Sequence, residues 1–152
     1  MDTDISWAAG FIDGEGTITI KRYRRDGKRL HYQVMITCGQ VYKPAQARAV
    51  RKLKELFGGS VLISKLNQKN EYWCDVITWR AVSKEAIACV KMLLPYLIVK
   101  KAQAEVLIKY SEGITPSKGG PPLTDTELEK RGDFFMEMRA LNVKGKLRLQ
   151  RL

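Results

Sequence analysis

Positions 7–16 read Trp-Ala-Ala-Gly-Phe-Ile-Asp-Gly-Glu-Gly, and this stretch decides the fold. Small residues alternate with large apolar ones, and Gly10 and Gly14 are four apart, so on a helix they share one face. A glycine inside a helix costs about 1 kcal/mol relative to alanine, so two on one face indicate close approach of a second backbone. Glu15 follows where the helix ends, and Gly16 can turn the chain. The pattern predicts a close-packed helix pair whose end presents a carboxylate.

Alternating hydrophobicity and turn signals predict two strand pairs and five helices. The first helix runs over residues 4–13, capped by Asp4, and strands at 17–23 and 30–40 follow around an Asp-Gly turn. A helix begins at Pro44 and ends at Gly58, and a second strand pair follows at 60–66 and 71–80. Later helices are expected from Ser83 to Pro95, over 100–110, and from a capping box at Thr124 to about 142.

Residues 8–16 resemble the signature of the LAGLIDADG homing endonucleases position by position, with Glu15 in place of its last aspartate. The order of the expected elements also matches the αββαββα core of that family through about residue 110. The resemblance implies a single α+β domain over residues 1–152, with a core at about 4–112 and a C-terminal helix and basic tail at about 123–152. A curved antiparallel sheet would bind DNA.

Only one copy of the motif is present, so two active carboxylates imply a homodimer. In that family the motif helix packs against its counterpart from a second copy. The resemblance places Ala9, Gly10, Asp13 and Gly14 in the dimer interface.

Charge and composition favour a polyanionic partner. The 152 residues carry a net charge of +11, with 45% hydrophobic residues, which suits a globular protein that binds nucleic acid. No apolar run approaches the roughly 20 residues that span a membrane, and the start is unlike a signal peptide. We therefore expect an intracellular protein of a prokaryotic cytoplasm or an organelle. Three widely spaced cysteines predict a reduced core, and no phosphate-binding loop for a nucleotide cofactor is present.

The first strand pair carries the clearest DNA-binding pattern. Its aliphatic residues alternate with hydrogen-bonding ones, and basic residues crowd its turn, where they would neutralise phosphates. The expected DNA-binding residues are Thr19, Lys21, Tyr23, Arg25, Lys28, Gln33, Met35 and Thr37. Ser64 and Lys69 are weaker candidates, because both faces of the second pair mix polar and apolar residues and its orientation stays open.

Glu15 is the expected metal ligand. Mg²⁺ prefers oxygen ligands and needs only one or two carboxylates, and Ca²⁺ or Mn²⁺ would be its substitutes. The resemblance adds the backbone carbonyl of Gly14 as a ligand and Lys100, after the proline that ends the third helix, as a catalytic cation. It places Tyr42 and Gln46 where water-positioning residues are expected, with Gln40 and Arg48 as alternatives. Asp13 is assigned to hydrogen bonding at the helix end.

These features predict a homodimeric, site-specific homing endonuclease, encoded by an intron or a free-standing gene, that makes staggered double-strand breaks at a long pseudo-palindromic site. The alternative on the same fold is a non-cleaving DNA- or RNA-binding protein, either a transcription regulator or an intron-splicing maturase. A basic ribosome-associated protein is a second alternative, but it does not explain the glycine pair at Gly10 and Gly14.

Overall fold

A computed structural model describes residues 2–27, 29–65, 74–115 and 119–143. Helix α1 (Asp2–Glu15) runs directly into strand β1 (Gly16–Arg25), and β2 (Arg29–Val41) returns beside it. Helix α2 (Pro44–Phe57) then leads to β3 (Ser60–Ser64) and β4 (Val76–Val82). Helix α3 (Ser83–Leu93), a short 3₁₀ turn η1 (Leu94–Tyr96), α4 (Lys101–Gly113) and α5 (Asp125–Asn142) complete the described chain.

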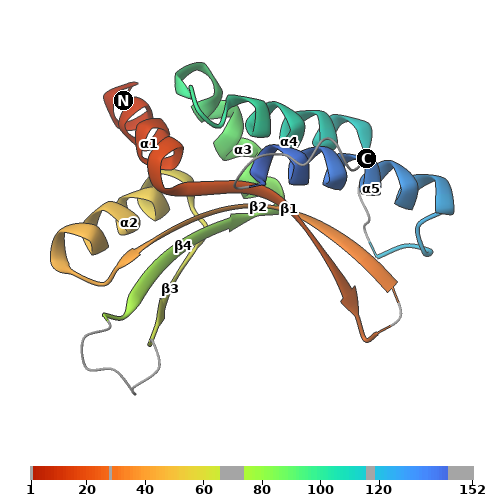
Figure 1. Ribbon diagram of the computed structural model, residues 1–152, viewed down its shortest axis with the longest axis horizontal. Helices are drawn as coiled ribbons and strands as arrows, with labels where there is room; N and C mark the ends of the chain where they lie inside the picture. Colours follow the sequence, from red (N-terminus) through yellow and green to blue (C-terminus); the bar gives the residue numbers. More distant parts are fainter. Residues whose placement is uncertain (1, 28, 66–73, 116–118, 144–152) are drawn as a thin grey trace.

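The four strands form one antiparallel sheet in the order β1-β2-β4-β3. The sheet bends into an arch, and the helices lie on its outer side, so that its inner face stays open (Figure 1). This arrangement confirms the expected αββαββα core with a curved sheet.

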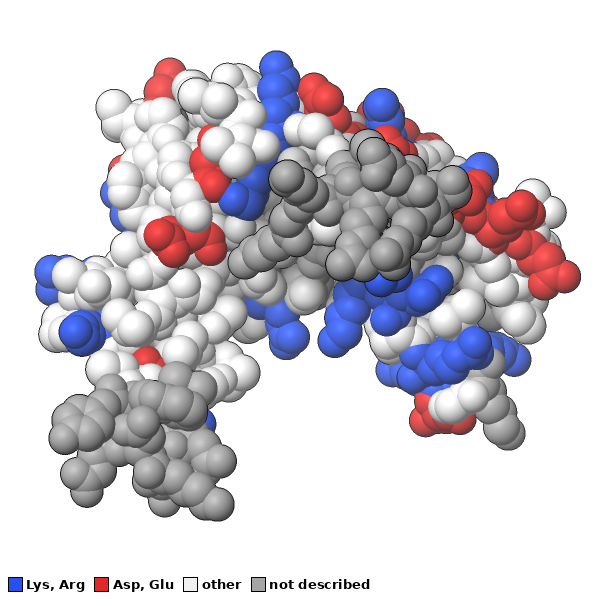
Figure 2. Space-filling model, in the orientation of Figure 1, with Lys and Arg blue, Asp and Glu red and all other residues white. Residues whose placement is uncertain are grey.

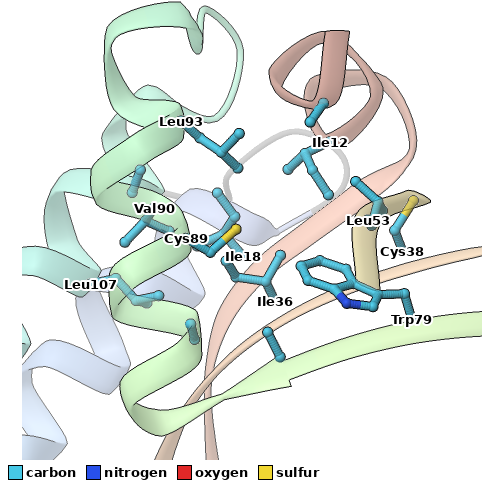
Figure 3. Packing of buried hydrophobic residues seen from close by; sticks show 14 of the residues in the cluster. Ile12, Ile18, Ile36, Cys38, Leu53, Trp79, Cys89, Val90, Leu93 and Leu107 are labelled. Atoms are coloured by element: carbon cyan, nitrogen blue, oxygen red, sulfur yellow. The ribbon is translucent and has the colours of Figure 1, made fainter. Parts of the chain in front are cut away.

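The core lies between the sheet and the helices. Figure 3 shows side chains of α1, α2, α3 and α4 converging on the covered face of the sheet. Ile18, Ile36 and Trp79 supply the sheet side of this core and are completely buried. The indole N–H of Trp79 donates to the carbonyl of Gly58 at 2.8 Å, which satisfies the polar atom of a buried aromatic residue.

Strand alternation explains why one face is covered and the other open. Ile18 and Ile20 of β1 are buried together with Val34, Ile36 and Cys38 of β2, as their spacing predicts. In β4, Ile77, Trp79 and Ala81 are buried, which orients the second strand pair. The residues between them therefore face the inside of the arch.

Several local predictions need correction. Asp4 does not cap α1 but lies within it, and its carboxylate pairs with the Lys52 ammonium at 2.5 Å. Thr124 caps α5 as expected, since its hydroxyl accepts from the Glu127 N–H at 3.2 Å. The Glu127 side chain, however, accepts from the Thr115 N–H at 2.9 Å instead of closing a capping box. Ser83 begins α3, but no side-chain capping bond is formed there.

The cysteines are all free: Cys38 and Cys89 are buried as expected, whereas Cys74 is exposed. Across the described residues, no helix is both long and apolar enough to cross a membrane. The expected turn at 67–70 and the first three residues (71–73) of the strand expected at 71–80 lie outside the described residues, as does the basic tail.

Candidate active site and nucleic-acid interface

Glu15 is the last residue of α1 and is exposed. Gly16 follows it in such close contact with the helix that an added Cβ would lie 2.9 Å from the Ile12 carbonyl oxygen. This contact fixes how the helix passes into β1 and so fixes the position of Glu15. The Gln40 side-chain amide donates to one carboxylate oxygen of Glu15 at 3.0 Å. The end of α1 therefore presents an oriented carboxylate.

Asp13 connects the same end of α1 to the start of α4. Its carboxylate accepts from the backbone N–H groups of Ile98 at 2.7 Å and Lys100 at 2.9 Å. Burial raises the pKa of Asp13, but the N–H groups of Ile98, Lys100 and Val99 and the charge of Lys100 outweigh it, so the pKa is lowered overall. The interpretation of Asp13 as a hydrogen-bonding residue is confirmed.

Lys100 lies beside this carboxylate. Its ammonium donates to the backbone carbonyl of Asp13 at 2.5 Å. The structure thus brings Lys100, expected as a catalytic cation, to the end of the helix that carries Glu15.

Cys38 of β2 lies under the influence of both Glu15 and Lys100. Burial is the main reason that the pKa of its thiol is raised to about 12; the Glu15 charge adds to the rise and the Lys100 charge opposes it. Both charged groups are therefore close enough to act on one buried sulfur. The thiol stays protonated at neutral pH, which excludes it as a nucleophile.

Among the described residues, no hydrogen bond links Tyr42 or Gln46 to Glu15, Asp13 or Lys100. The Tyr42 hydroxyl accepts from Arg51 at 3.4 Å, and its backbone N–H donates to the Asp75 carbonyl at 2.7 Å. Gln46 is half-buried on α2. Within the described chain, Gln40, an alternative candidate in the sequence, is the side chain that hydrogen-bonds to Glu15.

The outer face of α1 carries the two motif glycines. Gly10 and Gly14 are exposed, and an added Cβ at either would have no heavy atom of this chain within 4 Å. Ala9 is 0% exposed, so it is packed inside its own chain and offers no surface to a partner; its assignment to the dimer interface is wrong. Asp13 is half-buried and bonded within its own chain.

The open face of the sheet collects the expected DNA-binding residues. Register pairs Thr19 with Met35, Lys21 with Gln33, and Thr17 with Thr37 across β1 and β2. Tyr23, Arg25 and Ser64 lie on the same face by strand alternation. Lys28 and Lys69 lie outside the described residues. Figure 2 shows lysines and arginines along the inner side of the arch and over the β1–β2 arm.

Two residues of this face, His31 and Arg80, were not among the DNA-binding residues expected from the sequence. His31 lies opposite Tyr23, and their rings stack with centroids 5.5 Å apart. Arg80 is exposed on β4 between the buried residues Trp79 and Ala81. The strand alternation around Arg80 becomes a usable signal only once Trp79 is known to point into the core.

The geometry agrees with comparison to known proteins. The family model of the LAGLIDADG endonucleases matches residues 8–110, which include the α1 motif, the whole sheet and most of α4. The chain belongs to the LAGLIDADG endonuclease family. The match confirms the resemblance drawn from residues 8–16.

Several LAGLIDADG proteins are similar along most of their length. DNA endonuclease I-CvuI of Chlorella vulgaris is 24% identical over 123 residues, which cover 81% of this chain and 73% of that protein. The structure of I-CvuI with its target DNA in the presence of Ca²⁺ has a TM-score of 0.75 at 22% identity, covering 95% of this chain and 85% of that one. The archaeal intron-encoded I-Vdi141I bound to DNA has a TM-score of 0.70 at 18% identity, covering 95% and 87%. These likenesses show the LAGLIDADG fold.

Proposed function

We propose that this protein is a homodimeric homing endonuclease that cleaves both strands of a long, nearly two-fold-symmetric DNA site. The observation that carries the proposal is the placement of the Glu15 carboxylate and the Lys100 ammonium around the end of α1, in a chain whose open sheet face is rich in cations. Family membership and the DNA-bound complexes of I-CvuI and I-Vdi141I support the same activity.

The donor set at the end of α1 suits Mg²⁺. Gln40 donates to one Glu15 oxygen, which leaves the other oxygen available, and the Gly14 carbonyl belongs to the last turn, where helical carbonyls lack helical partners. No group of three or more His, Cys, Asp or Glu side chains is present among the described residues. Mg²⁺ does not need one, since it binds through one or two carboxylates, waters and substrate phosphates. When bound, Mg²⁺ supplies an activated water and neutralises phosphate charge.

The side chains around Glu15 have separate tasks in this proposal. Gln40 holds the carboxylate in one orientation through its 3.0 Å hydrogen bond, and Glu15 with Gly14 would hold the metal. Lys100, kept in place by Asp13, supplies a positive charge that stabilises negative charge developing on the phosphate. The Tyr42 hydroxyl accepts from Arg51, and the assignment of water positioning to Tyr42 and Gln46 stays a prediction from the sequence.

Two strand cuts need two carboxylates, and this sequence holds one motif copy. A homodimer through α1 supplies the second. Its support is the exposed face of Gly10 and Gly14 and the apolar surface next to it, where Ile98 and Val99 are 85% and 69% exposed. The Ile98 backbone is bonded to Asp13, so this apolar surface is continuous with the end of α1.

The deciding experiment is cleavage of a randomised duplex library in Mg²⁺ or EDTA by the wild type and Glu15→Gln. We expect metal-dependent breaks at one enriched, two-fold-related sequence, and none with Glu15→Gln, because the amide lacks the ligand charge while the sheet is untouched. The variant should keep its DNA affinity within a few-fold. Retention of specific sequences without breaks by the wild type would favour the non-cleaving regulator or maturase, and joint loss of folding and binding in the variant would make Glu15 structural.

A further inference from the structure

Arg80 is the central feature of the open sheet face formed by β3 and β4. Trp79 and Ala81 are completely buried under the helices, so Arg80 between them projects from the opposite face, and it is exposed. Register places it in one row with Thr37 of β2 and Ser60 of β3. Since β4 lies between β2 and β3, Arg80 is away from both edges of the sheet.

The surroundings of Arg80 set it apart from the other cations of this face. The β1–β2 arm groups Lys21, Arg25 and Arg29, as expected of a surface that neutralises phosphates. Arg80 instead stands among short hydroxyl and apolar side chains. Over the described parts of β3 and β4, the other open-face residues are Ser60, Leu62, Ser64, Val76, Thr78 and Val82, none of which is charged.

Two further observations leave the guanidinium available. The ion pairs in the described part of the chain are Lys52 with Asp4 and Arg131 with Glu127, so no carboxylate there binds Arg80. Gly39 lies in the neighbouring row opposite Thr78. Because glycine has no side chain, no side chain projects from the open face at that position beside Arg80. The arginine side chain is longer than those of its neighbours, so its guanidinium can project beyond them from the sheet surface.

We propose that Arg80 determines sequence specificity by donating two N–H bonds to O6 and N7 of one guanine in each half of the target site. The inference rests on the proposed DNA binding and adds to it one residue and the base that it reads. Two parallel N–H donors of a guanidinium match the two major-groove acceptors of guanine, O6 and N7. Because β4 is not an edge strand, Arg80 would face the base edges in the groove and not the phosphates on either side of it. The uncharged neighbours suit contacts with thymine methyl groups.

The test is a binding selection from randomised duplexes in Ca²⁺, followed by affinity measurements at several salt concentrations. It compares the wild type with Arg80→Ala and Arg80→Gln. The matched control is Lys91→Ala, which removes one exposed cation from the last turn of α3 on the helical side.

We expect wild type and Lys91→Ala to select guanine at one position in each half-site. Arg80→Ala should lose that preference alone, with affinity for the selected site falling about 5- to 150-fold per half-site, which is the usual worth of a bidentate base contact. Arg80→Gln should prefer adenine at the same position, because an amide matches adenine N6 and N7. A misfolded protein could not produce such a switch.

Other outcomes overturn the inference. If Arg80→Ala weakens all sequences equally and lowers the salt dependence by about 0.9 per subunit, Arg80 contacts a phosphate. If it binds and selects as the wild type does, Arg80 does not contact DNA. Either result leaves the proposed function standing, whereas a wild type that enriches no sequence overturns the proposed function together with this inference.

Discussion

Gly10→Ala should have opposite effects on the single chain and on the dimer. Gly10 lies inside α1, and an added Cβ has nothing within 4 Å in its own chain. The helix then gains about 1 kcal/mol from alanine, with no steric cost. For a chain of this size, that raises the unfolding midpoint by roughly 2–4 °C.

The same methyl group is expected to weaken the dimer. If α1 packs against α1 of a second copy through Gly10, each chain pushes a methyl group into a contact that has room only for hydrogen. Overpacking of this kind costs about 1–3 kcal/mol, and each 1.4 kcal/mol is a factor of ten in affinity. The dimer dissociation constant should therefore rise about 5- to 150-fold, and Gly10→Leu should abolish dimerisation.

Sedimentation equilibrium over a range of concentrations measures the dissociation constant, and thermal unfolding at low concentration measures the chain alone. Gly113→Ala is the control, because its Cβ would make an ordinary 3.5 Å contact with Phe134 near the end of α4. The control should leave dimerisation unchanged. Gly10→Ala chains that unfold at a higher temperature yet associate as tightly as wild type would refute packing through this face.

Two further substitutions test the turn that carries Glu15. Asp13→Asn should lower the unfolding free energy by about 1–2 kcal/mol at pH 7 in urea titrations, because an amide oxygen replaces the carboxylate that accepts from Ile98 and Lys100. Folding depresses the pKa of Asp13 below 3.8, so the advantage of the wild type is present above that pH and is lost as pH falls through the folded value; a constant gap in acid would contradict this cause. Gly16→Ala places a methyl 2.9 Å from the Ile12 carbonyl and should cost about 1–3 kcal/mol by thermal unfolding, with slower cleavage; wild-type stability would count against that contact.

The first strand pair was predictable because its pattern is unambiguous. Ile18 and Ile20 alternate with polar residues, and so do Val34 and Ile36, so only one orientation buries aliphatic groups. The second pair offers large apolar residues on both faces, and its orientation depends on a tertiary contact. Trp79 points into the core, where its indole N–H donates to the Gly58 carbonyl. Hydrophobic spacing in the sequence does not predict that hydrogen bond.

Gln40 was only an alternative candidate in the sequence for a related reason. Strand β2 continues to Val41, so Gln40 lies on the same helix-covered face of the sheet as Ile36 and Cys38. This is the side on which α1 ends. A glutamine at that end of a strand has no distinguishing sequence signal. Its function follows from the place where α1 delivers Glu15, which is set by packing between elements.

The two acids of the motif show why one short turn can carry both the fold and the proposed chemistry. Successive residues of an α-helix are rotated by about 100°, so Asp13 and Glu15 leave the helix on opposite sides of Gly14. Asp13 points to the backbone of residues 98–100 and fixes Lys100, while Glu15 points to Gln40 and the sheet. Gly14, between them, keeps an open face for a second copy. A dimer through that face would bring both carboxylates and both lysines to the two-fold axis, so the packing of the two α1 helices would set the spacing of the two proposed cuts.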